Sequence, residues 1–293
     1  MRKVFCLLSF LCVAFALGQA QAQPTAEHGK YLVEVLGSCG NCHTPKGSKG
    51  DIPEKHMAGG FKLDEAFGVA VSPNITPDKE TGIGNWTDQE IIRAIREGKA
   101  KDGSTLGPPM PFWLYRRMSD NDVKAIVAYL RTLKPIKNQA ARSEYKIPLP
   151  ASYGPPVASV PEPPQNDPVK YGEYLAGPIA HCADCHTPMG SEGRRDQTRL
   201  FAGGSPFHGP YGTIYATNLT PDKETGIGKW TDGQIIAAIY GVRPDGRQLQ
   251  PPMPWPYYKE KISNGDLKAI LAYLRSLKPI QNKVPAPLLT KKH

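Results

Sequence analysis

The chain repeats itself, and this repeat limits its possible folds more than any other feature. Asn74 to Asp88 returns almost unchanged as Asn218 to Asp232, and Cys39-Gly-Asn-Cys-His43 returns as Cys182-Ala-Asp-Cys-His186. The two copies of each segment lie 143 or 144 residues apart. Solenoid repeats have periods of about 20–50 residues. The much longer interval in this chain therefore indicates a duplicated domain.

The remainder of the chain divides into regions of different composition. Residues 1–22 have the pattern of a secretory signal peptide, with a basic start, an apolar stretch and Ala20-Gln21-Ala22 as a cleavage site. An uncleaved membrane anchor is the alternative. For the rest we expect a first domain over 23–136, a linker over 137–168, a second domain over 169–285 and a basic tail over 286–293. The linker contains eight prolines, which favours a semi-rigid strap, with a disordered tether as the alternative.

The clearest secondary-structure signals in both copies are helical. Thr87-Asp-Gln-Glu90 and Thr231-Asp-Gly-Gln234 have the pattern of capping boxes, which satisfy free N–H groups at a helix start. The last helix of each copy carries an apolar stripe and ends at Lys134-Pro135 or Lys278-Pro279, because proline cannot continue a helix. We expect an all-α protein whose long glycine- and proline-rich loops surround a large apolar cofactor in each copy.

Charge and cysteine content narrow the partners and the chemistry. The formal net charge is +9, which favours acidic protein partners or an anionic membrane face. Nucleic acid is not expected as a partner, because the lysines are scattered and the protein is expected to be exported. Four of the six cysteines remain after the signal peptide. In an exported protein, two disulfides are the default interpretation of four cysteines.

The histidine that follows each cysteine pair argues against that default. Each copy contains one C-x-x-C-H motif, and the motif residues are Cys39, Cys42, His43, Cys182, Cys185 and His186. C-x-x-C-H is the attachment signature of c-type haem, in which two sulfurs bind the porphyrin and the histidine binds iron. We therefore expect two covalently bound haem c groups. A redox dithiol or a metal site is the alternative.

An iron that only carries electrons needs a sixth ligand. Met110 and Met253 occupy equivalent positions, and each lies between prolines, in Pro108-Pro-Met-Pro111 and Pro251-Pro-Met-Pro254. We predict that these two methionines are the axial ligands opposite the motif histidines. The other methionines of the mature chain are interpreted as core residues: Met57, Met118 and Met189. The other histidines do not recur in both copies and are not expected to bind iron: His28, His56, His181, His208 and His293.

Two tryptophans also recur. Trp86 and Trp230 follow the shared Gly-Ile-Gly segment of the two copies. Each indole N–H could donate to a haem propionate, or each ring could simply fill the core. Both interpretations stay open at this point.

Each copy resembles a class I cytochrome c domain, with an entering helix, C-x-x-C-H, a methionine loop and a closing helix. The resemblance implies that the first and last helices cross, with Tyr129 and Tyr273 meeting the glycine side of the entering helix at Gly29 and Gly172. The segment after Asn74 and its copy are similar to the multihaem cytochrome subunits of periplasm-facing alcohol and gluconate-type dehydrogenases. Those subunits commonly have three haem domains, whereas we expect two here, and no membrane-binding tail.

This resemblance implies a periplasmic dihaem cytochrome, not an enzyme, that carries single electrons from a periplasmic dehydrogenase towards the respiratory chain. The expected partner is a dehydrogenase subunit or another redox protein, with peripheral membrane association as a further option. The alternative is a dihaem enzyme, such as a cytochrome c peroxidase or a thiosulfate-oxidising cytochrome. A peroxidase needs an open iron position and the thiosulfate type is expected to use a cysteine ligand. Neither fits two equivalent methionine loops without a further cysteine.

Overall fold

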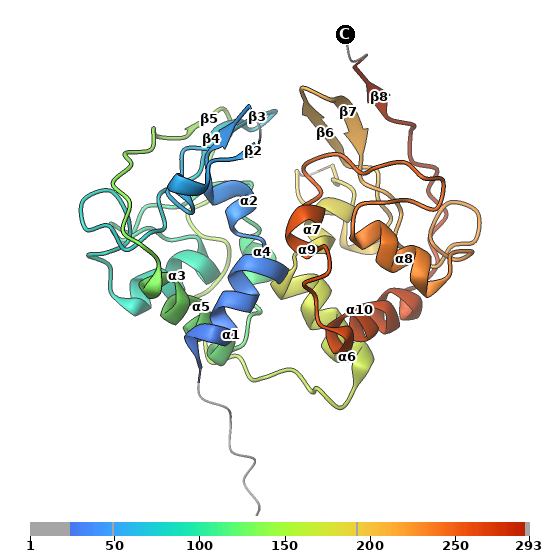
Figure 1. Ribbon diagram of the computed structural model, residues 1–293, viewed down its shortest axis with the longest axis horizontal. Helices are drawn as coiled ribbons and strands as arrows, with labels where there is room; N and C mark the ends of the chain where they lie inside the picture. Colours follow the sequence, from blue (N-terminus) through green and yellow to red (C-terminus); the bar gives the residue numbers. More distant parts are fainter. Residues whose placement is uncertain (1–23, 49, 192, 291–293) are drawn as a thin grey trace, which may run out of the picture.

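Two halves with the same order of helices lie side by side in the computed structural model (Figure 1). The structure describes residues 24–48, 50–191 and 193–290, so the predicted signal peptide lies outside the described residues. The helices of the first half are α1 Ala26–Tyr31, α2 Gly40–His43, α3 Asp88–Glu97, α4 Phe112–Tyr115 and α5 Asp120–Thr132. Those of the second half are α6 Pro168–Tyr174, α7 Cys182–His186, α8 Asp232–Ile239, α9 Trp255–Tyr258 and α10 Asn264–Ser276.

In each half, the first helix crosses the last helix at a glycine. A Cβ atom on Gly29 of α1 would lie 1.9 Å from the carbonyl oxygen of Ala125 in α5 and 2.9 Å from the Cβ of Tyr129. Gly172 of α6 meets Ala269 of α10 at the same 1.9 Å. Only glycine lets two helix backbones approach this closely. The crossing implied by the resemblance, including the tyrosine contact, is therefore confirmed.

The helix starts and the core also follow the sequence pattern. Thr87 and Glu90 form a capping box at α3, and Thr231 and Gln234 form one at α8, as predicted. Both helices α1 and α6 continue into π-helical turns, η1 Leu32–Leu36 and η3 Leu175–Ile179. The buried faces of these elements and of the closing helices join in one apolar cluster that runs through both halves. The two halves therefore share a core.

The all-α prediction is wrong, because the loops form three small antiparallel sheets in the described part of the chain. Their strands are β1 Lys46–Gly47, β2 Gly50–Asp51, β3 Lys62–Glu65, β4 Gly68–Val71, β5 Glu144–Tyr145, β6 Pro206–Gly209, β7 Gly212–Tyr215 and β8 Leu288–Leu289. The sheet orders are β1-β2, β3-β4-β5 and β6-β7-β8. Backbone groups in long loops need hydrogen-bond partners, and these loops find them in hairpins too short to give a clear alternating pattern. The chain after each closing helix returns to add the third strand.

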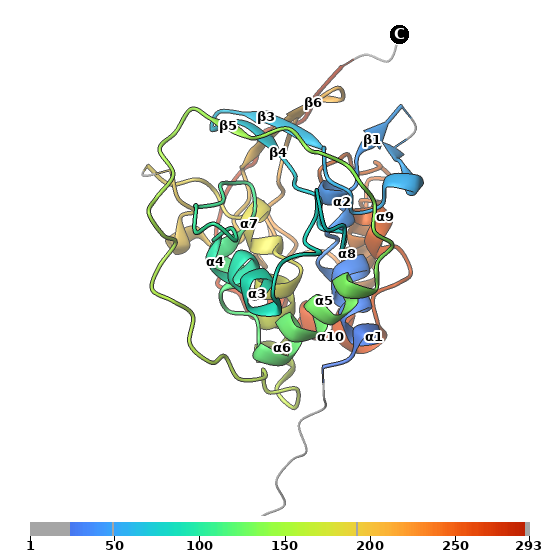
Figure 2. The ribbon, with the colours of Figure 1, turned by 90° about the vertical axis from the view of Figure 1, so that its left-hand side faces the viewer.

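After β5, the proline-rich segment runs along the outside of the first half (Figure 2). Lys99 Nζ donates to the carbonyl of Ala151 at 2.6 Å, and the Asp120 N–H donates to the carbonyl of Val160 at 2.9 Å. The Tyr153 ring packs against the Phe112 ring with centroids 4.8 Å apart. Residues 151–160 are thus tied to the first half at several points, which is the behaviour of a strap.

Two tyrosines connect the halves in a crossed arrangement. The hydroxyl of Tyr31 in α1 donates to Asp266 Oδ2 in α10 at 2.6 Å and accepts from the Ser263 N–H at 3.0 Å. The hydroxyl of Tyr174 in α6 makes the equivalent contacts with the start of α5: it donates to Asp122 and accepts from the Ser119 N–H at 2.9 Å. Each half therefore helps to cap the closing helix of the other.

The first half contains a partly buried polar cluster that the second half lacks. His56 Nε2 lies 2.8 Å from Glu34 Oε1, and the Tyr129 hydroxyl donates to the same oxygen at 2.6 Å. Burial alone would raise the pKa of Glu34, but these hydrogen bonds outweigh it and hold that pKa below its ordinary value. The hydrogen bond to Glu34 raises the pKa of His56 against the effect of burial. Gly177 and Leu200 stand at the equivalent positions of the second half.

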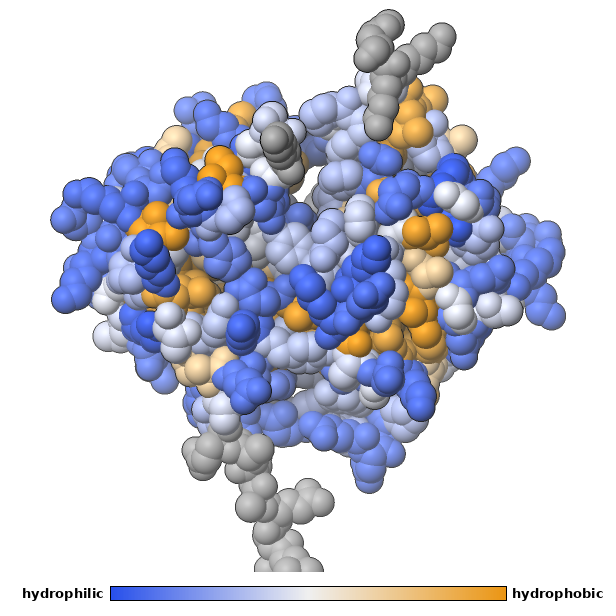
Figure 3. Space-filling view, viewed as in Figure 1, coloured by the Kyte–Doolittle hydropathy of each residue, from blue (hydrophilic) through white to orange (hydrophobic). Residues whose placement is uncertain are grey.

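The surface seen in Figure 3 is mainly hydrophilic, with small separate apolar areas. The large apolar side chains exposed in the described residues are Ile147, Val169, Met189, Val242, Leu288 and Leu289. Among the described residues, no helix combines the length and the apolar character needed to cross a membrane.

The helix crossing gives a direct test of packing. We expect Gly29→Ala to destabilise the protein by about 1–3 kcal/mol or more, because a Cβ atom cannot fit against a backbone carbonyl. Thermal or denaturant unfolding measures this loss. Gly233→Ala in α8 is the control, since the nearest atom to an added Cβ is 3.9 Å away. It should leave stability unchanged or raise it by about 0.4–1 kcal/mol. Equal effects of both substitutions would contradict the crossing.

The Glu34–His56 pair predicts a pH-dependent contribution to stability. A histidine whose pKa is raised by folding stabilises the fold below its ordinary pKa of 6.5 and loses this contribution as pH rises through the folded value. We therefore expect the difference in melting temperature between wild type and His56→Gln to be largest in mild acid and to shrink at alkaline pH. Tyr129→Phe is the control, because its hydroxyl does not titrate in this window. A gap that stayed constant with pH would contradict the ion pair.

Candidate functional site

The two cysteine–histidine motifs each fold into one helical turn that places both sulfurs on the same side. In the first, the N–H groups of Cys42 and His43 donate to the carbonyl of Cys39 at 3.2 Å and 2.9 Å. Residues three apart in a helix share a face, so the two thiols of the pair point the same way and the histidine follows them. In the second motif, α7 covers all five residues. The four thiols are free, so the disulfide interpretation fails.

The thiols lie in surroundings that keep them neutral. Burial raises the pKa of Cys39 and of Cys185 to about 12 and that of Cys182 to about 11, and it also raises the pKa of Cys42. A redox dithiol needs the opposite, a depressed pKa that exposes a reactive thiolate. A neutral thioether is compatible with such surroundings. The environment therefore disfavours the redox-dithiol alternative.

Each motif histidine has one ring nitrogen already occupied, and His43 is buried whereas His186 is partly buried. His43 Nδ1 lies 2.9 Å from the carbonyl oxygen of Pro73, and His186 Nδ1 lies 2.7 Å from that of Thr217. A carbonyl can only accept, so Nδ1 carries the proton in both rings. Burial lowers the pKa of both histidines, and the carbonyl contacts oppose this only in part. Both imidazoles are therefore neutral, with the Nε2 lone pair available for a metal.

The predicted methionines and tryptophans lie at the edge of the same apolar core as the motif cysteines. Met110 and Trp86 in the first half, and Met253 and Trp230 in the second, are partly buried and pack against the core cluster together with Cys39 and Cys182. The Phe112 N–H donates to the carbonyl of Met110 at 2.9 Å, so the methionine loop leads directly into α4. All of these side chains thus contact the apolar core that the two halves share.

Two of the three remaining methionines lie in the core, as the sequence predicts. Met57 and Met118 are fully buried core residues, but Met189 is 54% exposed, so its assignment to the core is wrong. Met189 lies in a loop, where its backbone forms an isolated antiparallel bridge with Arg195. Four of the other histidines have protein partners: His28 with Asp122, His56 with Glu34, His181 with the carbonyl of Gly37 and His208 with Glu65. His293 lies outside the described residues.

Two arginines near the tryptophans were missed by the sequence analysis. Arg131 of α5 donates to the carbonyls of Ile83, at 3.1 Å, and of Trp86. Arg275 of α10 repeats these contacts with Ile227 and Trp230. These arginines fix the backbone that carries each tryptophan. Their recurrence in the repeat was the available signal, but an arginine at a helix end is usually read as a solvated charge.

Each motif helix makes a hydrogen bond across the boundary between the halves. Asn41, inside the first motif, donates to the carbonyl of Pro252, next to Met253, at 3.3 Å. Trp113, which follows the first methionine loop, donates to Asp184 inside the second motif at 2.8 Å. Each motif therefore contacts the methionine-loop region of the other half, and the two sites adjoin each other.

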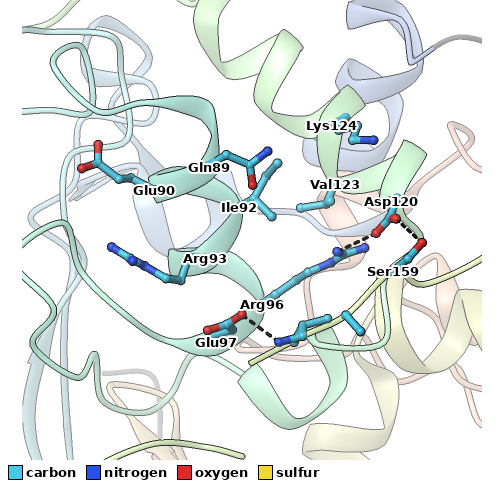
Figure 4. A pocket seen from close by; sticks show the side chains of 12 residues that line it. Gln89, Glu90, Ile92, Arg93, Arg96, Glu97, Asp120, Val123, Lys124 and Ser159 are labelled. Carbon is cyan, nitrogen blue, oxygen red and sulfur yellow. Dashed lines mark hydrogen bonds and ion pairs between the residues drawn. The ribbon is translucent and has the colours of Figure 1, made fainter. Parts of the chain in front are cut away.

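A cavity of about 480 Å³ lies elsewhere, between α3, the start of α5 and residues 157–159 of the strap. Two of its charged residues have partners in the lining: Arg96 binds Asp120 at 2.8 Å, and Glu97 accepts from the Val157 N–H at 2.9 Å (Figure 4). None of the predicted haem-binding residues lines it. These contacts attach the strap to the helices.

The residues present fit a covalently bound haem better than the alternatives. Each half offers two partly buried neutral thiols on one side of a helical turn, a neutral imidazole with a free Nε2, and a methionine packed against the shared core. Among the described residues there is no cluster of three or more His, Cys, Asp and Glu side chains able to hold a bare metal ion. The donor set of imidazole nitrogen and thioether sulfur is one used for haem iron in cytochromes c.

Comparisons with known proteins agree with this geometry. The chain is 31% identical over 268 residues to the fructose dehydrogenase cytochrome subunit of Gluconobacter japonicus, covering 87% of this chain and 53% of that protein. It is 30% identical over 296 residues to the cytochrome c subunit of the alcohol dehydrogenase (quinone) of Gluconobacter oxydans, covering 94% of this chain and 60% of that one. The chain thus spans little more than half the length of these two relatives.

A relative of similar length also matches. The diheme cytochrome c-type protein of Cereibacter sphaeroides is 30% identical over 262 residues, covering 84% of this chain and 83% of that protein. These relatives confirm the resemblance inferred from the sequence. The family model for cytochrome c matches twice, at residues 26–134 and 170–278. The chain therefore belongs to the cytochrome c family.

Proposed function

We propose that this protein is a dihaem c-type cytochrome that carries single electrons. The observation that carries the proposal is a neutral imidazole that follows two partly buried neutral thiols, present once in each half. The proposed thioether residues are Cys39, Cys42, Cys182 and Cys185. The proposed axial pairs are His43 with Met110 and His186 with Met253, and Trp86 and Trp230 are proposed propionate contacts. The proposed domains are 23–136 and 169–285, joined by the linker 137–168.

The chain's own residues would hold each haem and limit its chemistry. When bound, the haem supplies an iron that gains or loses one electron. The cysteines attach the group covalently, so it stays in place when the surrounding loops move. The histidine, oriented through Nδ1, would bind the iron through Nε2, and the methionine would bind it through its sulfur. With both ligands supplied by the protein, the iron would have no position left for a substrate, which is the arrangement of a carrier.

The donor and the compartment are also proposals. Two relatives are named as cytochrome subunits of fructose and alcohol dehydrogenases, so we propose a dehydrogenase as electron donor and the respiratory chain as the destination. The signal-peptide pattern of residues 1–22 supports the periplasm as the location. The dihaem-enzyme alternative gains no support from the relatives, which are named as cytochromes or cytochrome subunits.

Replacing the proposed methionine ligands tests the assignment. We expect Met110→Ala to abolish the methionine-to-iron absorption band of one haem and Met253→Ala that of the other. Because methionine ligation raises the reduction potential, each substitution should lower one midpoint potential by on the order of 0.1 V, within the range that axial ligands control. Optical redox titration measures both effects.

The matched control is Met189→Ala, since this side chain is exposed and the equivalent position of the first half holds a lysine, Lys46. It should leave the spectrum and both potentials unchanged. If the double variant of Met110 and Met253 kept both absorption spectra and both potentials, the proposed carrier would have no basis.

The positive net charge predicts a salt-dependent encounter with an acidic donor. Electrostatic attraction between proteins is screened over about 8 Å at physiological ionic strength, so we expect reduction by a small acidic flavoprotein to slow as salt is added. Stopped-flow measurement of the second-order rate constant against ionic strength checks this, with a neutral small-molecule reductant as control. A flat profile for the acidic flavoprotein would contradict electrostatic steering.

A further inference from the structure

The carbonyl that orients the first histidine belongs to a tightly enclosed peptide group. A Cβ atom on Gly59 would lie 2.4 Å from the carbonyl carbon of Pro73 and 2.5 Å from the nitrogen of Asn74, so the Gly59 backbone packs directly on this peptide. The Gly59 N–H also donates to the backbone carbonyl of His43 at 2.7 Å. The Pro73–Asn74 peptide therefore lies between the imidazole on one side and Gly59 on the other.

The side chain of Asn74 anchors this peptide through several hydrogen bonds. Its Nδ2 donates to the carbonyl of Ile136 at 2.8 Å and to Thr81 Oγ1 at 3.1 Å. Its Oδ1 accepts from the N–H and the hydroxyl of Thr76 at 2.9 Å and 2.8 Å. Asn74 is 3% exposed and Thr76 is fully buried, so water does not compete for these bonds. Asn74 therefore has little freedom to shift, and neither does the carbonyl attached to it.

A second asparagine closes the circuit back to the histidine. Asn138 Nδ2 donates to the carbonyls of Ala58, at 2.9 Å, and of Gly59, at 3.3 Å. Its backbone N–H donates to Thr81 Oγ1 at 3.0 Å, the same oxygen that Asn74 binds. These contacts form a closed circuit. It runs from His43 to Gly59, Asn138, Thr81, Asn74 and Pro73 and returns to the imidazole.

The second half contains the same circuit, built from the equivalent residues. Asn218 Nδ2 donates to the carbonyl of Ile280 at 2.7 Å and to Thr225 Oγ1 at 3.1 Å, and Asn282 Nδ2 donates to the carbonyl of Ala202 at 2.8 Å. The Gly203 N–H donates to the carbonyl of His186 at 2.7 Å. Proline at position 73 is replaced by threonine at 217, yet the carbonyl contact is retained. The arrangement therefore depends on the asparagines and not on the residue that supplies the carbonyl.

We propose that Asn74 and Asn218 are positioning residues, which set the strength of the histidine-to-carbonyl bond in their own half and thereby the reduction potential of that half's haem. The inference rests on the proposed function, since it requires His43 and His186 to bind iron. The asparagines touch neither histidine. They act through the carbonyls of Pro73 and Thr217.

The direction of the effect follows from ligand basicity. A firm hydrogen bond from Nδ1 to a carbonyl makes the imidazole more electron-rich, which stabilises the oxidised iron and lowers the potential. Without the asparagine anchor, the carbonyl can tilt away and the bond weakens. The potential of that half should then rise, while the other half is unaffected because its own circuit is intact.

The experiment uses the full-length holoprotein and follows both haems by spectroelectrochemical titration. We expect Asn74→Ala to raise one midpoint potential and Asn218→Ala to raise the other, with the double variant raising both. The exchange rate of the corresponding histidine Nδ1 proton, followed by NMR in the reduced protein, should increase in the same half. Asn85→Ala is the control, because Asn85 is exposed in the same segment and its side chain donates to the exposed-loop carbonyl of Lys79, away from either histidine carbonyl.

A merely structural role predicts a lower melting temperature with both potentials and both proton-exchange rates unchanged, and that result would overturn the inference. So would a shift of the same haem by both single variants. If Asn74→Ala does not fold, Asn138→Ala leaves Asn74 in place and should shift the same potential upward by less. The haem content of the wild type distinguishes a failure of the proposed function from a failure of this inference. Protein without two covalent haems refutes the proposed function. Two covalent haems whose potentials do not change in the variants refute only this inference.

Discussion

In each half, the motif imidazole makes a hydrogen bond to a backbone carbonyl, and the arrangement of the surrounding loops depends on this contact. His43 and His186 are held neutral inside the protein, where an unpaired ring N–H would be costly. The carbonyl must therefore be delivered from a loop thirty or so residues further along the chain. That requirement explains why so much of the Gly- and Pro-rich loop is tied down by asparagine and threonine side chains.

Both copies keep this hydrogen bond, but they fix the loop before the methionine with different side chains. In the first half, the strap residue Tyr153 donates to the carbonyl of Leu106 at 2.8 Å. In the second half, the indole of Trp255 donates to the equivalent carbonyl of Leu249 at 3.1 Å. One half thus borrows an aromatic side chain from the strap, and the other uses its own α9. The crossed Tyr31 and Tyr174 contacts then join the halves through a shared core.

Sequence reasoning identified the residues whose chemistry is carried by identity and spacing. The capping box at Thr87 could be predicted, because it depends on neighbours within a few positions. The roles of the C-x-x-C-H residues and of the repeated methionines stay predictions. The strands could not, since β5 pairs with β4 only after the chain has passed through the whole first half. Asn74 and Arg131 were also missed as functional supports, because their partners, Ile136 and Trp86, lie more than forty residues away.

The sequence by itself determined that the chain is a tandem duplication with one haem-binding motif per copy, because a repeat and a C-x-x-C-H motif are local patterns that need no folded context. Only the tertiary structure decided how the two copies meet, with Asn41 against Pro252 and Trp113 against Asp184. It also decided that burial keeps the cysteine thiols and the motif histidines neutral. Burial and contacts between the halves arise when segments far apart in the sequence exclude water together. No run of adjacent residues specifies which distant segments will meet.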